Sequence, residues 1–289
     1  MGDKSMIEWT EATWNPVTGC TKVSQGCKNC YAERVFPRAY GVHVKDATPR
    51  KFTEVRCHPD RLDQPLRWRR ARRIFVNSMS DLFHEDVPDQ FIRDVFERMC
   101  RASHHHFQVL TKRPERMRQC RAGVAVLPNV WLGVSVEDQK TLMERLPHLM
   151  ATPAAVRFVS YEPALGPVNF APWLKPVSCV SPDPHGRDQR IDWIIAGGES
   201  GPRARPSHPD WFRAVRDQCQ AAGVPFFFKQ WGEYTPNGRG PVWRWIKADE
   251  LASDGLWAKD APGVIPVWRV GKKAAGRLLD GCEYSEYPA

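Results

Sequence analysis

The sequence predicts an α/β fold, built as a complete or partial (βα) TIM-type barrel. Apolar β-type runs alternate with helix-compatible segments, and each run ends in polar or glycine residues, which is typical of parallel strands joined by crossover helices. The expected strands are a first one around Trp14 to Val17 and then 74–81, 107–114, 130–138, 156–163, 191–200 and 225–233. The expected helices are 88–103, 114–122, 138–150 and 208–222. About seven strands are enough for a complete or nearly complete barrel.

The remainder of the chain is expected to form a cap. We assign residues 1–233 to the barrel and 234–289 to an irregular C-terminal extension packed on it. This extension is rich in tryptophan among Gly and Pro, namely Trp243, Trp245, Trp257 and Trp268. In a barrel of this kind the functional residues are expected at the carboxyl ends of the strands, where the βα loops converge.

Composition limits the classes of function. The chain has 289 residues, of which 42% are apolar, so it can bury a sizeable core. Its longest apolar runs, such as 191–198, are much shorter than the roughly 20 residues of a membrane-spanning helix. The first residues lack the basic and apolar blocks of a secretory signal. We therefore expect a cytoplasmic protein without a membrane partner, and the formal charge of +9 favours a polyanionic partner.

Three of the nine cysteines lie close together in the sequence. The segment WNPVTGCTKVSQGCKNC places Cys20, Cys27 and Cys30 in a Cys-x6-Cys-x2-Cys array directly after the first strand. Gly19 and Gly26 each precede a cysteine, where their backbone freedom helps thiolates to converge. In a reducing compartment such spacing indicates metal ligands rather than disulfides, and a helix is expected to start after Cys30.

The metal is expected to be an iron–sulfur cluster. Structural zinc requires four ligands, and the candidates for a fourth, His43, Cys57 or His58, have no partner at a characteristic spacing. A 4Fe–4S cluster with three protein ligands leaves one iron open for a small molecule. Zinc, or no metal, stays open as an alternative.

The three-cysteine loop on a predicted βα barrel resembles the radical S-adenosylmethionine (SAM) superfamily. More closely, the blocks WNPVTGC, GCKNCYAE, LTKRP, GVSVED, GGESGPRARP and FFKQWG resemble a prokaryotic and phage family catalogued by its three-cysteine motif. The resemblance implies a 4Fe–4S cluster and S-adenosylmethionine as cofactors, with an external electron donor such as flavodoxin or ferredoxin. It also implies that a 5′-deoxyadenosyl radical abstracts hydrogen from the substrate. The chain departs from the superfamily in its longer first cysteine interval and in Asn29, with Tyr31 after it, where an aromatic residue usually precedes the last cysteine.

The resemblance also suggests the cofactor site. The methionine ammonium would be bound by the acceptors Asn77, Ser78, Ser80 and Asp81. Lys112 or Arg113 would pair with a carboxylate or phosphate. Ser135 and Glu137 would face the ribose. The GGESG turn would bring Gly197, Gly198 and Glu199 close to the ligand, and Tyr31 would face the adenine. As isolated features, strand-end polar groups and tight turns are equally compatible with structural roles.

A nucleic-acid partner is suggested by arginines gathered around an aromatic residue. The residues of this site would be Arg67, Trp68, Arg69, Arg70, Arg72, Arg73, Arg113, Arg203 and Arg205. The alternative interpretation of the segment 61–73 is a solvated helix face.

Spore photoproduct lyase is the nearest analogue among radical enzymes that act on DNA. By that analogy the chain is a lyase for a DNA photolesion, with Tyr161, Tyr234 or Cys282 as the residue that returns hydrogen. Two other functions stay open: a zinc-stabilised nucleic-acid-binding protein without catalysis, and a radical enzyme with a small-molecule or peptide substrate. The sequence does not indicate an oligomeric state.

Overall fold

The computed structural model describes residues 5–40, 50–175, 189–239, 244–249 and 263–289. In this described part the parallel strands form a seven-stranded sheet in the order β1-β4-β5-β6-β7-β8-β9. The predicted α/β class is therefore confirmed, and the barrel is partial. The chain divides into two compact units, Met1–Val134 with Ala151–Arg157, and Ser135–Met150 with Phe158–Ala289.

The first unit carries the parallel strands that follow the predicted runs. They are β1 (Ala12–Trp14), β4 (Arg73–Val76), β5 (His106–Thr111) and the start of β6 (Val130–Ser135). Strand β6 is buried along its whole length, whereas β4 alternates between buried and half-buried positions. An entirely buried strand requires cover on both faces of the sheet, as in α/β folds.

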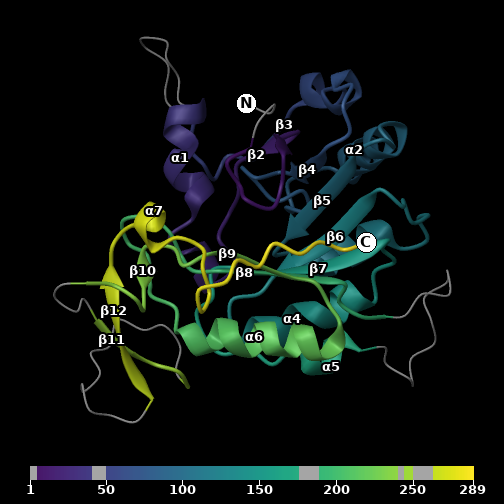
Figure 1. The fold of residues 1–289 in the computed structure, drawn as a ribbon. Coiled ribbons are helices and arrows are strands. Elements are labelled where there is room, and N and C mark those ends of the chain that lie inside the picture. The colour runs from purple at the N-terminus through teal and green to yellow at the C-terminus, as the bar shows by residue number, and fades with distance from the viewer. Residues whose placement is uncertain (1–4, 41–49, 176–188, 240–243, 250–262) are drawn as a thin grey trace. The chain divides into compact units, whose positions relative to one another are not determined.

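Three helices and several short elements complete this unit (Figure 1). The helices are α1 (Tyr31–Tyr40), α2 (Asp89–Arg101) and α3 (Pro114–Arg121). Helix α2 buries one apolar face, formed by Phe91, Ile92, Val95, Phe96 and Met99. The short antiparallel pair β2 (Val17–Thr18) and β3 (Arg56–Cys57) precedes and follows the α1 region in sequence. The helix predicted after Cys30 is thus present, and Pro37 lies inside it.

The arginine-rich segment 61–73 does not form an α-helix. It contains two 3-10 turns, Pro59–Arg61 and Pro65–Arg67, before β4 begins at Arg73. Each turn starts with a proline, which suits the first position of a helical turn. The alternative interpretation of this segment as a solvated helix face is therefore wrong.

The second unit contains the remaining parallel strands and their helices. They are α4 (Gln139–Met150), β7 (Val156–Tyr161), α5 (Ala171–Leu174), β8 (Trp193–Gly197), α6 (Pro209–Ala222) and β9 (Phe226–Gln230). Strands β7, β8 and β9 pair in parallel, and α6 packs against β8, β9 and α5. Helix α6 ends at Gly223, whose φ of +65° is the left-handed conformation that a helix C-terminus favours.

The tail beyond the parallel strands has more regular structure than the sequence indicates. It forms a three-stranded antiparallel sheet in the order β10 (Tyr234–Thr235), β12 (Val264–Arg269) and β11 (Arg244–Lys247), followed by α7 (Lys272–Ala275). Trp245 lies on β11 and Trp268 on β12, whereas Trp243 and Trp257 lie outside the described residues. The predicted boundary at residue 233 stays a prediction.

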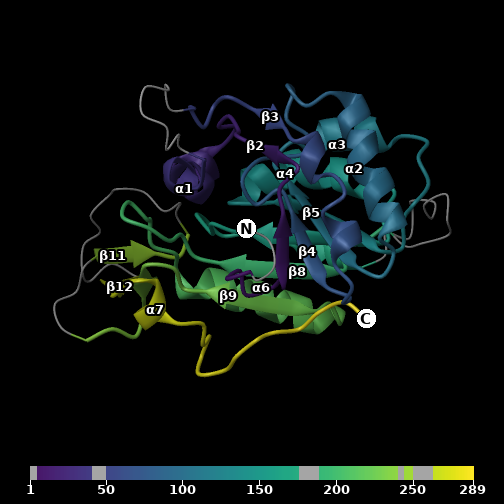
Figure 2. The same cartoon turned by 90° about the horizontal axis from the view of Figure 1, so that it is seen from above.

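The last residues of the chain are attached to β9 and β8. Ser285 bridges Phe227 in antiparallel fashion, and the Trp193 indole Nε1 donates to the carbonyl oxygen of Glu286 at 2.9 Å. Figure 2 shows this extended segment, in yellow, running alongside β9. In the described part of the chain, no helix is both long and apolar enough to cross a lipid bilayer.

Asp280 attaches this tail to α6. Its carboxylate accepts hydrogen bonds from Arg213 Nε at 2.9 Å and from Arg216 Nη1 at 2.8 Å. The two guanidinium groups, chiefly through the Arg213 hydrogen bonds, lower the pKa of Asp280 to about 2. Because the folded-state pKa lies below the unfolded value, the stabilisation is complete above about pH 4 and is lost as the pH falls toward 2.

We predict that Asp280→Asn lowers the free energy of unfolding by about 0.5–1 kcal/mol at pH 7, a small figure because the carboxylate is partly solvated. Urea titrations should show that the difference from the wild type narrows between about pH 4 and pH 2. Asp94→Asn, on exposed helix α2, is the control. An unchanged difference down to pH 2 would contradict the assignment.

Candidate functional site

Cys20 has a tightly fixed backbone in the first unit. Gly19 has a φ of +92° and donates its N–H to the Met79 carbonyl at 3.1 Å. The Cys20 N–H donates to the carbonyl oxygen of Phe52 at 2.9 Å. A Cβ at Gly19 would lie 2.5 Å from the carbonyl oxygen of Glu54, so both the conformation and the space require glycine here. The Cys20 loop is thereby held between the residues after β4 and the segment before β3.

Cys27 and Cys30 lie on a short turn that leads into α1. Cys27 ends the 3-10 turn Gln25–Cys27, and Cys30 immediately precedes Tyr31, the first residue of the helix. The Cys30 thiol accepts hydrogen bonds from the backbone amides of Ala32 and Glu33, which act to lower its pKa. Unpaired amides at a helix N-terminus stabilise a thiolate. Tyr31, the predicted adenine contact, is exposed.

The three thiols share one electrostatic environment. Burial, followed by the charge of Asp81, raises the pKa of Cys20 to about 11, although Arg113 opposes the shift. Burial also raises the pKa of Cys30. The charge of Cys27 raises the pKa of both, so each of the other two thiols lies within its electrostatic range.

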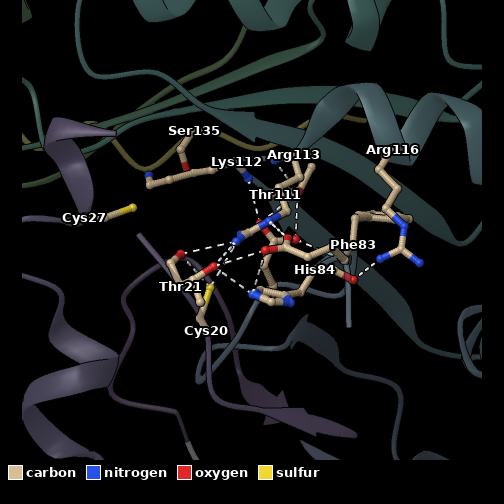
Figure 3. Close-up of polar contacts among 12 residues, drawn as sticks. Cys20, Thr21, Cys27, Phe83, His84, Thr111, Lys112, Arg113, Arg116 and Ser135 are labelled. Carbon is tan, nitrogen blue, oxygen red and sulfur yellow. Dashed lines mark hydrogen bonds and ion pairs between the residues drawn. The ribbon is translucent and has the colours of Figure 1, made fainter. Parts of the chain in front are cut away.

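The guanidinium of Arg113 makes contact with this loop (Figure 3). Its Nη1 lies 3.5 Å from Cys20 Sγ, and its Nη2 donates to Thr21 Oγ1 at 2.8 Å and to the Thr21 carbonyl at 3.3 Å. Nε donates to Glu85 at 3.0 Å. Burial acts to lower the pKa of Arg113, but Asp81, Cys20 and Glu85 outweigh it and raise the pKa. Lys112, whose charge lowers the Cys30 pKa, is a second cation beside the thiols.

Asp81 connects the ends of β4 and β5. Its buried carboxylate accepts from Thr111 Oγ1 at 2.7 and 2.9 Å, from the Lys112 amide at 3.0 Å and from the Phe83 amide at 3.0 Å. Arg113 Nη1 lies 3.5 Å from the same carboxylate. These contacts hold the Lys112 backbone and Arg113 in position, and the predicted role of Asp81 as an acceptor for the methionine ammonium stays a prediction.

The other three residues predicted to hold the methionine ammonium also contact the protein. Asn77, with a φ of +62°, accepts from the Val17 amide at 3.2 Å. The Ser80 hydroxyl donates to the Val17 carbonyl at 2.9 Å, and the Ser78 hydroxyl donates to Asn15 Oδ1 at 3.2 Å. These contacts join the turn after β4 to the turn after β1. They support the cysteine loop, and a cofactor role for these residues stays a prediction.

Sequence reasoning missed four residues of this cluster. They are Asn15, Thr21, His84 and Glu85. The His84 imidazole lies 2.8 Å from Thr21 Oγ1 through Nε2 and accepts from the Asp86 amide at 3.1 Å through Nδ1, an arrangement that fits a neutral ring protonated at Nε2. Burial and then Arg113 lower the pKa of His84. Asn15 and Thr21 lie in the segment WNPVTGCTKVSQGCKNC that the sequence analysis singled out, whereas His84 and Glu85 follow the predicted strand 74–81 and had no sequence signal.

The two predicted cofactor carboxylates of the second unit form ion pairs with arginines of the same unit. Glu137 is paired with Arg145, whose Nη1 lies 3.1 Å away and also donates to the Ser135 carbonyl at 2.7 Å. Glu199 and Arg205, predicted for the cofactor and for nucleic acid, form one buried bidentate pair with distances of 2.7 and 2.9 Å. Arg203, next to them, is exposed.

Gly198 of the GGESG turn allows a close approach between two segments of the chain. A Cβ at Gly198 would lie 2.0 Å from the Trp231 carbonyl oxygen. At Gly232 it would lie 2.1 Å from the carbonyl oxygen of Glu199. A Cβ at Gly197 would meet only the Glu162 side chain, at 3.4 Å. A tight turn at the end of the strand therefore explains why residue 198 is a glycine, and the predicted ligand contact is not needed for that explanation.

The three candidate hydrogen donors lie in different surroundings within the second unit. Tyr161 is fully enclosed and its phenol donates to the Gly166 carbonyl. Burial raises the Tyr161 pKa far above its ordinary value. Tyr234 is buried in an apolar cluster with Ala204 and Val267, whereas Cys282 is exposed. Tyr161 and Tyr234 thus serve as core residues in this structure.

The arginine-rich segment and the cysteine loop lie at opposite ends of β4. Arg67, Arg69 and Arg70 are exposed and precede the strand, which starts at Arg73. The cysteine loop instead pairs with the turn after the strand, through Gly19 and Ser80. The four residues of β4 alone separate the two regions by roughly 13 Å at about 3.3 Å per residue.

Aromatic and histidine side chains accompany the arginines at that end. Arg72 lies over the Trp68 ring at 5.3 Å, and His104 Nε2 lies 2.8 Å from the Trp68 carbonyl oxygen. His104 and His106 are exposed at the start of β5. The predicted nucleic-acid site includes both these arginines and Arg113, whereas the structure of the first unit places Arg113 with the cysteine loop, away from the segment that precedes β4.

A family model described as "Protein of unknown function (DUF5131)" matches residues 4–288. The chain belongs to the DUF5131 family. No curated protein sequence matches it significantly.

Solved structures with a likeness to this DUF5131 chain are spore photoproduct lyases. A mutant with bound AdoMet and dinucleoside spore photoproduct is 11% identical with a TM-score of 0.43, over 75% of this chain and 63% of that one. A second mutant is 12% identical with a TM-score of 0.45, over 93% and 72%. The chain therefore spans less than two thirds of the first of these proteins.

The DUF5131 chain offers three thiols of one loop as metal donors, which is the number that a 4Fe–4S cluster with one open iron would take. Among the described residues, no three His, Cys, Asp or Glu side chains gather around one ion position. Three residues were candidates for a fourth zinc ligand. His58 Nε2 lies 2.8 Å from Thr18 Oγ1, and Cys57 lies on β3, where its backbone pairs with Val17 of β2. His43 lies outside the described residues.

We predict that Asp81→Ala lowers the free energy of unfolding by about 3 kcal/mol, because it leaves buried amides and the Arg113 charge without their acceptor. Urea denaturation followed by circular dichroism measures the change. Asp86→Ala, which removes an exposed carboxylate from the same turn, should change stability by less than about 0.5 kcal/mol. Equal effects of the two substitutions would show that Asp81 is not the centre of this network.

Proposed function

We propose that this protein is a 4Fe–4S radical SAM enzyme that acts on nucleic acid, with reversal of a DNA photolesion as its specific reaction. One observation carries the proposal. Three thiols of a single loop share one electrostatic environment after the first strands, with Arg113 and Lys112 beside them. A cluster bound there would be ligated by Cys20, Cys27 and Cys30, which leaves one iron for the cofactor.

The bound cluster and S-adenosylmethionine would supply one-electron cleavage of the sulfonium and a radical that abstracts hydrogen. The contribution of the protein is to hold and orient these groups. The Gly19 turn fixes Cys20, the start of α1 donates amides to Cys30, and Lys112 adds positive charge near that thiol. An external electron donor such as flavodoxin or ferredoxin is part of the proposal.

Nucleic acid would bind through the arginines that precede β4. Their distance from the cysteine loop means that they would hold the backbone of a flanking stretch and not the reacting nucleotide. The exposed Arg67, Arg69 and Arg70 suit phosphates, and Trp68 with Arg72 suits a base or sugar face.

The same separation favours a second candidate, a radical enzyme for a small molecule or peptide. In that case the arginines that precede β4 would have a role other than binding the substrate. The two candidates differ in the effect of salt, since binding to nucleic acid weakens steeply as phosphate contacts are screened.

Anaerobically purified protein is predicted to contain about four irons and four sulfides per chain, with absorbance at about 400 nm that bleaches with dithionite. Alanine at Cys20, Cys27 or Cys30 should abolish both the iron and the formation of 5′-deoxyadenosine. Cys57→Ala and Cys120→Ala are the controls and should keep both. Colourless protein with one zinc per chain would reject the proposal. If the cluster and 5′-deoxyadenosine are present but ultraviolet-treated DNA is not repaired, only the photolesion reaction is rejected.

Replacing Arg67, Arg69 and Arg70 with Gln is predicted to weaken DNA binding and to reduce the slope of log K against log salt by about 1 for each arginine. Fluorescence anisotropy between 50 and 200 mM salt, roughly the range over which phosphate contacts are screened, measures the slope. Arg118→Gln on α3 is the control. Iron content should not change, because the segment lies away from the cysteine loop. A slope equal to that of the wild type would favour the small-molecule or peptide candidate.

A further inference from the structure

We propose that Arg113 is a positioning residue that holds Cys20 as a cluster ligand and raises the reduction potential of the cluster. The inference rests on the proposed function, because it needs a cluster on the cysteine loop. It gives Arg113 a different role from the one predicted from the sequence, which was contact with a carboxylate or a phosphate.

The hydrogen bonds of Arg113 leave no donor for a phosphate. A guanidinium has five N–H donors. Nε donates to Glu85, the two Nη1 donors face Cys20 Sγ and Asp81 Oδ2 at 3.5 Å each, and the two Nη2 donors face the carbonyl and hydroxyl oxygens of Thr21. The side chain is only 10% exposed. Five donors thus meet five acceptors within the protein.

The position of Arg113 is itself fixed from its backbone. Its N–H donates to Thr111 Oγ1 at 2.8 Å, and the same hydroxyl donates to Asp81. Pro114 then starts α3. The guanidinium is therefore held by the end of β5 and extends to the cysteine loop, as Figure 3 shows. Such pre-organisation lets it favour one position of Cys20 Sγ.

The charge of Arg113 would act on the cluster through the ligand sulfur. Hydrogen bonds to cluster sulfurs and nearby charge are among the factors that set the potential of an iron–sulfur cluster. A cation beside the thiolate stabilises the reduced form, which carries one more negative charge. Asp81 and Glu85 offset part of this charge, and removal of Arg113 would leave their negative charges near Cys20 without this cation. Loss of the cation should therefore favour the oxidised cluster.

The test is a redox titration of the reconstituted protein under anaerobic conditions, followed by visible absorbance and electron paramagnetic resonance. Arg113→Gln should shift the ratio of oxidised to reduced cluster about tenfold at a fixed potential, equivalent to about 59 mV for one electron. Arg113→Lys keeps the charge and loses the planar fork, so it should shift the ratio less.

Arg116→Gln is the matched control. Arg116 lies on α3, which begins directly after Arg113, and it donates to the carbonyl oxygens of His84 and Val87 and to Asp89. No contact with a cysteine is among its hydrogen bonds in the described structure. Its substitution should leave the potential unchanged. Circular dichroism checks that each variant is folded.

The outcomes separate this inference from the proposed function. Wild-type protein without iron would reject both. If both the wild type and Arg113→Gln bind a cluster, and the two clusters have the same reduction potential, only the role of Arg113 is overturned. A folded Arg113→Gln that retains less iron than Arg116→Gln supports the positioning of Cys20. If Arg113→Gln does not fold, Arg113→Lys decides. An unchanged reduction potential and iron content in Arg113→Lys overturns the role of the guanidinium, whereas a reduced iron content or a lowered potential supports that role.

Discussion

The carboxylate of Asp81 is the interaction on which the candidate site depends. It follows β4, yet its acceptors are filled from the end of β5, by the Thr111 hydroxyl and the Lys112 amide. This brings together the carboxyl ends of two neighbouring parallel strands. Because Arg113 comes next in sequence, the same contact sets the direction of a guanidinium that reaches Cys20. A buried carboxylate costs desolvation unless its hydrogen bonds are made, and here they are made by the groups that position the cysteine loop.

Several residues that look like ligand contacts in the sequence instead stabilise strand-end turns. Gly198 and Gly232 allow two chain segments to approach each other where any side chain would collide with a carbonyl oxygen. Glu199 and Arg205 neutralise each other in a buried pair six residues apart. Residues of this type are needed to build a turn at the edge of a parallel sheet, so their presence there is weak evidence for a cofactor. The cysteine loop is different, since burial raises the pKa of Cys20 and Cys30, and a bound metal would replace the protons that these thiols lose.

The distribution of positive charge bears on the choice between functions. One group of cations, Lys112 and Arg113, lies beside the thiols and is largely used within the protein. A second group precedes β4 and is exposed to solvent. An enzyme that acts on a long polyanion can use two such regions, one for chemistry and one for the flanking backbone. An enzyme for a small substrate has no need for the second.

The sequence by itself determined the α/β class, the parallel strands, the main helices and the loop that carries the three cysteines. These features depend on apolar periodicity, glycine placement and spacing along the chain, which are local properties. Tertiary structure decided which polar groups meet. The pairing of Asp81 with Thr111 and of Arg113 with Cys20 joins residues 30 and 93 positions apart, and the sequence contains no periodic signal for either. It also decided that the arginine-rich segment lies at the opposite end of β4 from the cysteines. An extended strand places the residues before it and the residues after it at its two opposite ends, whereas the sequence shows only that both groups are near the strand.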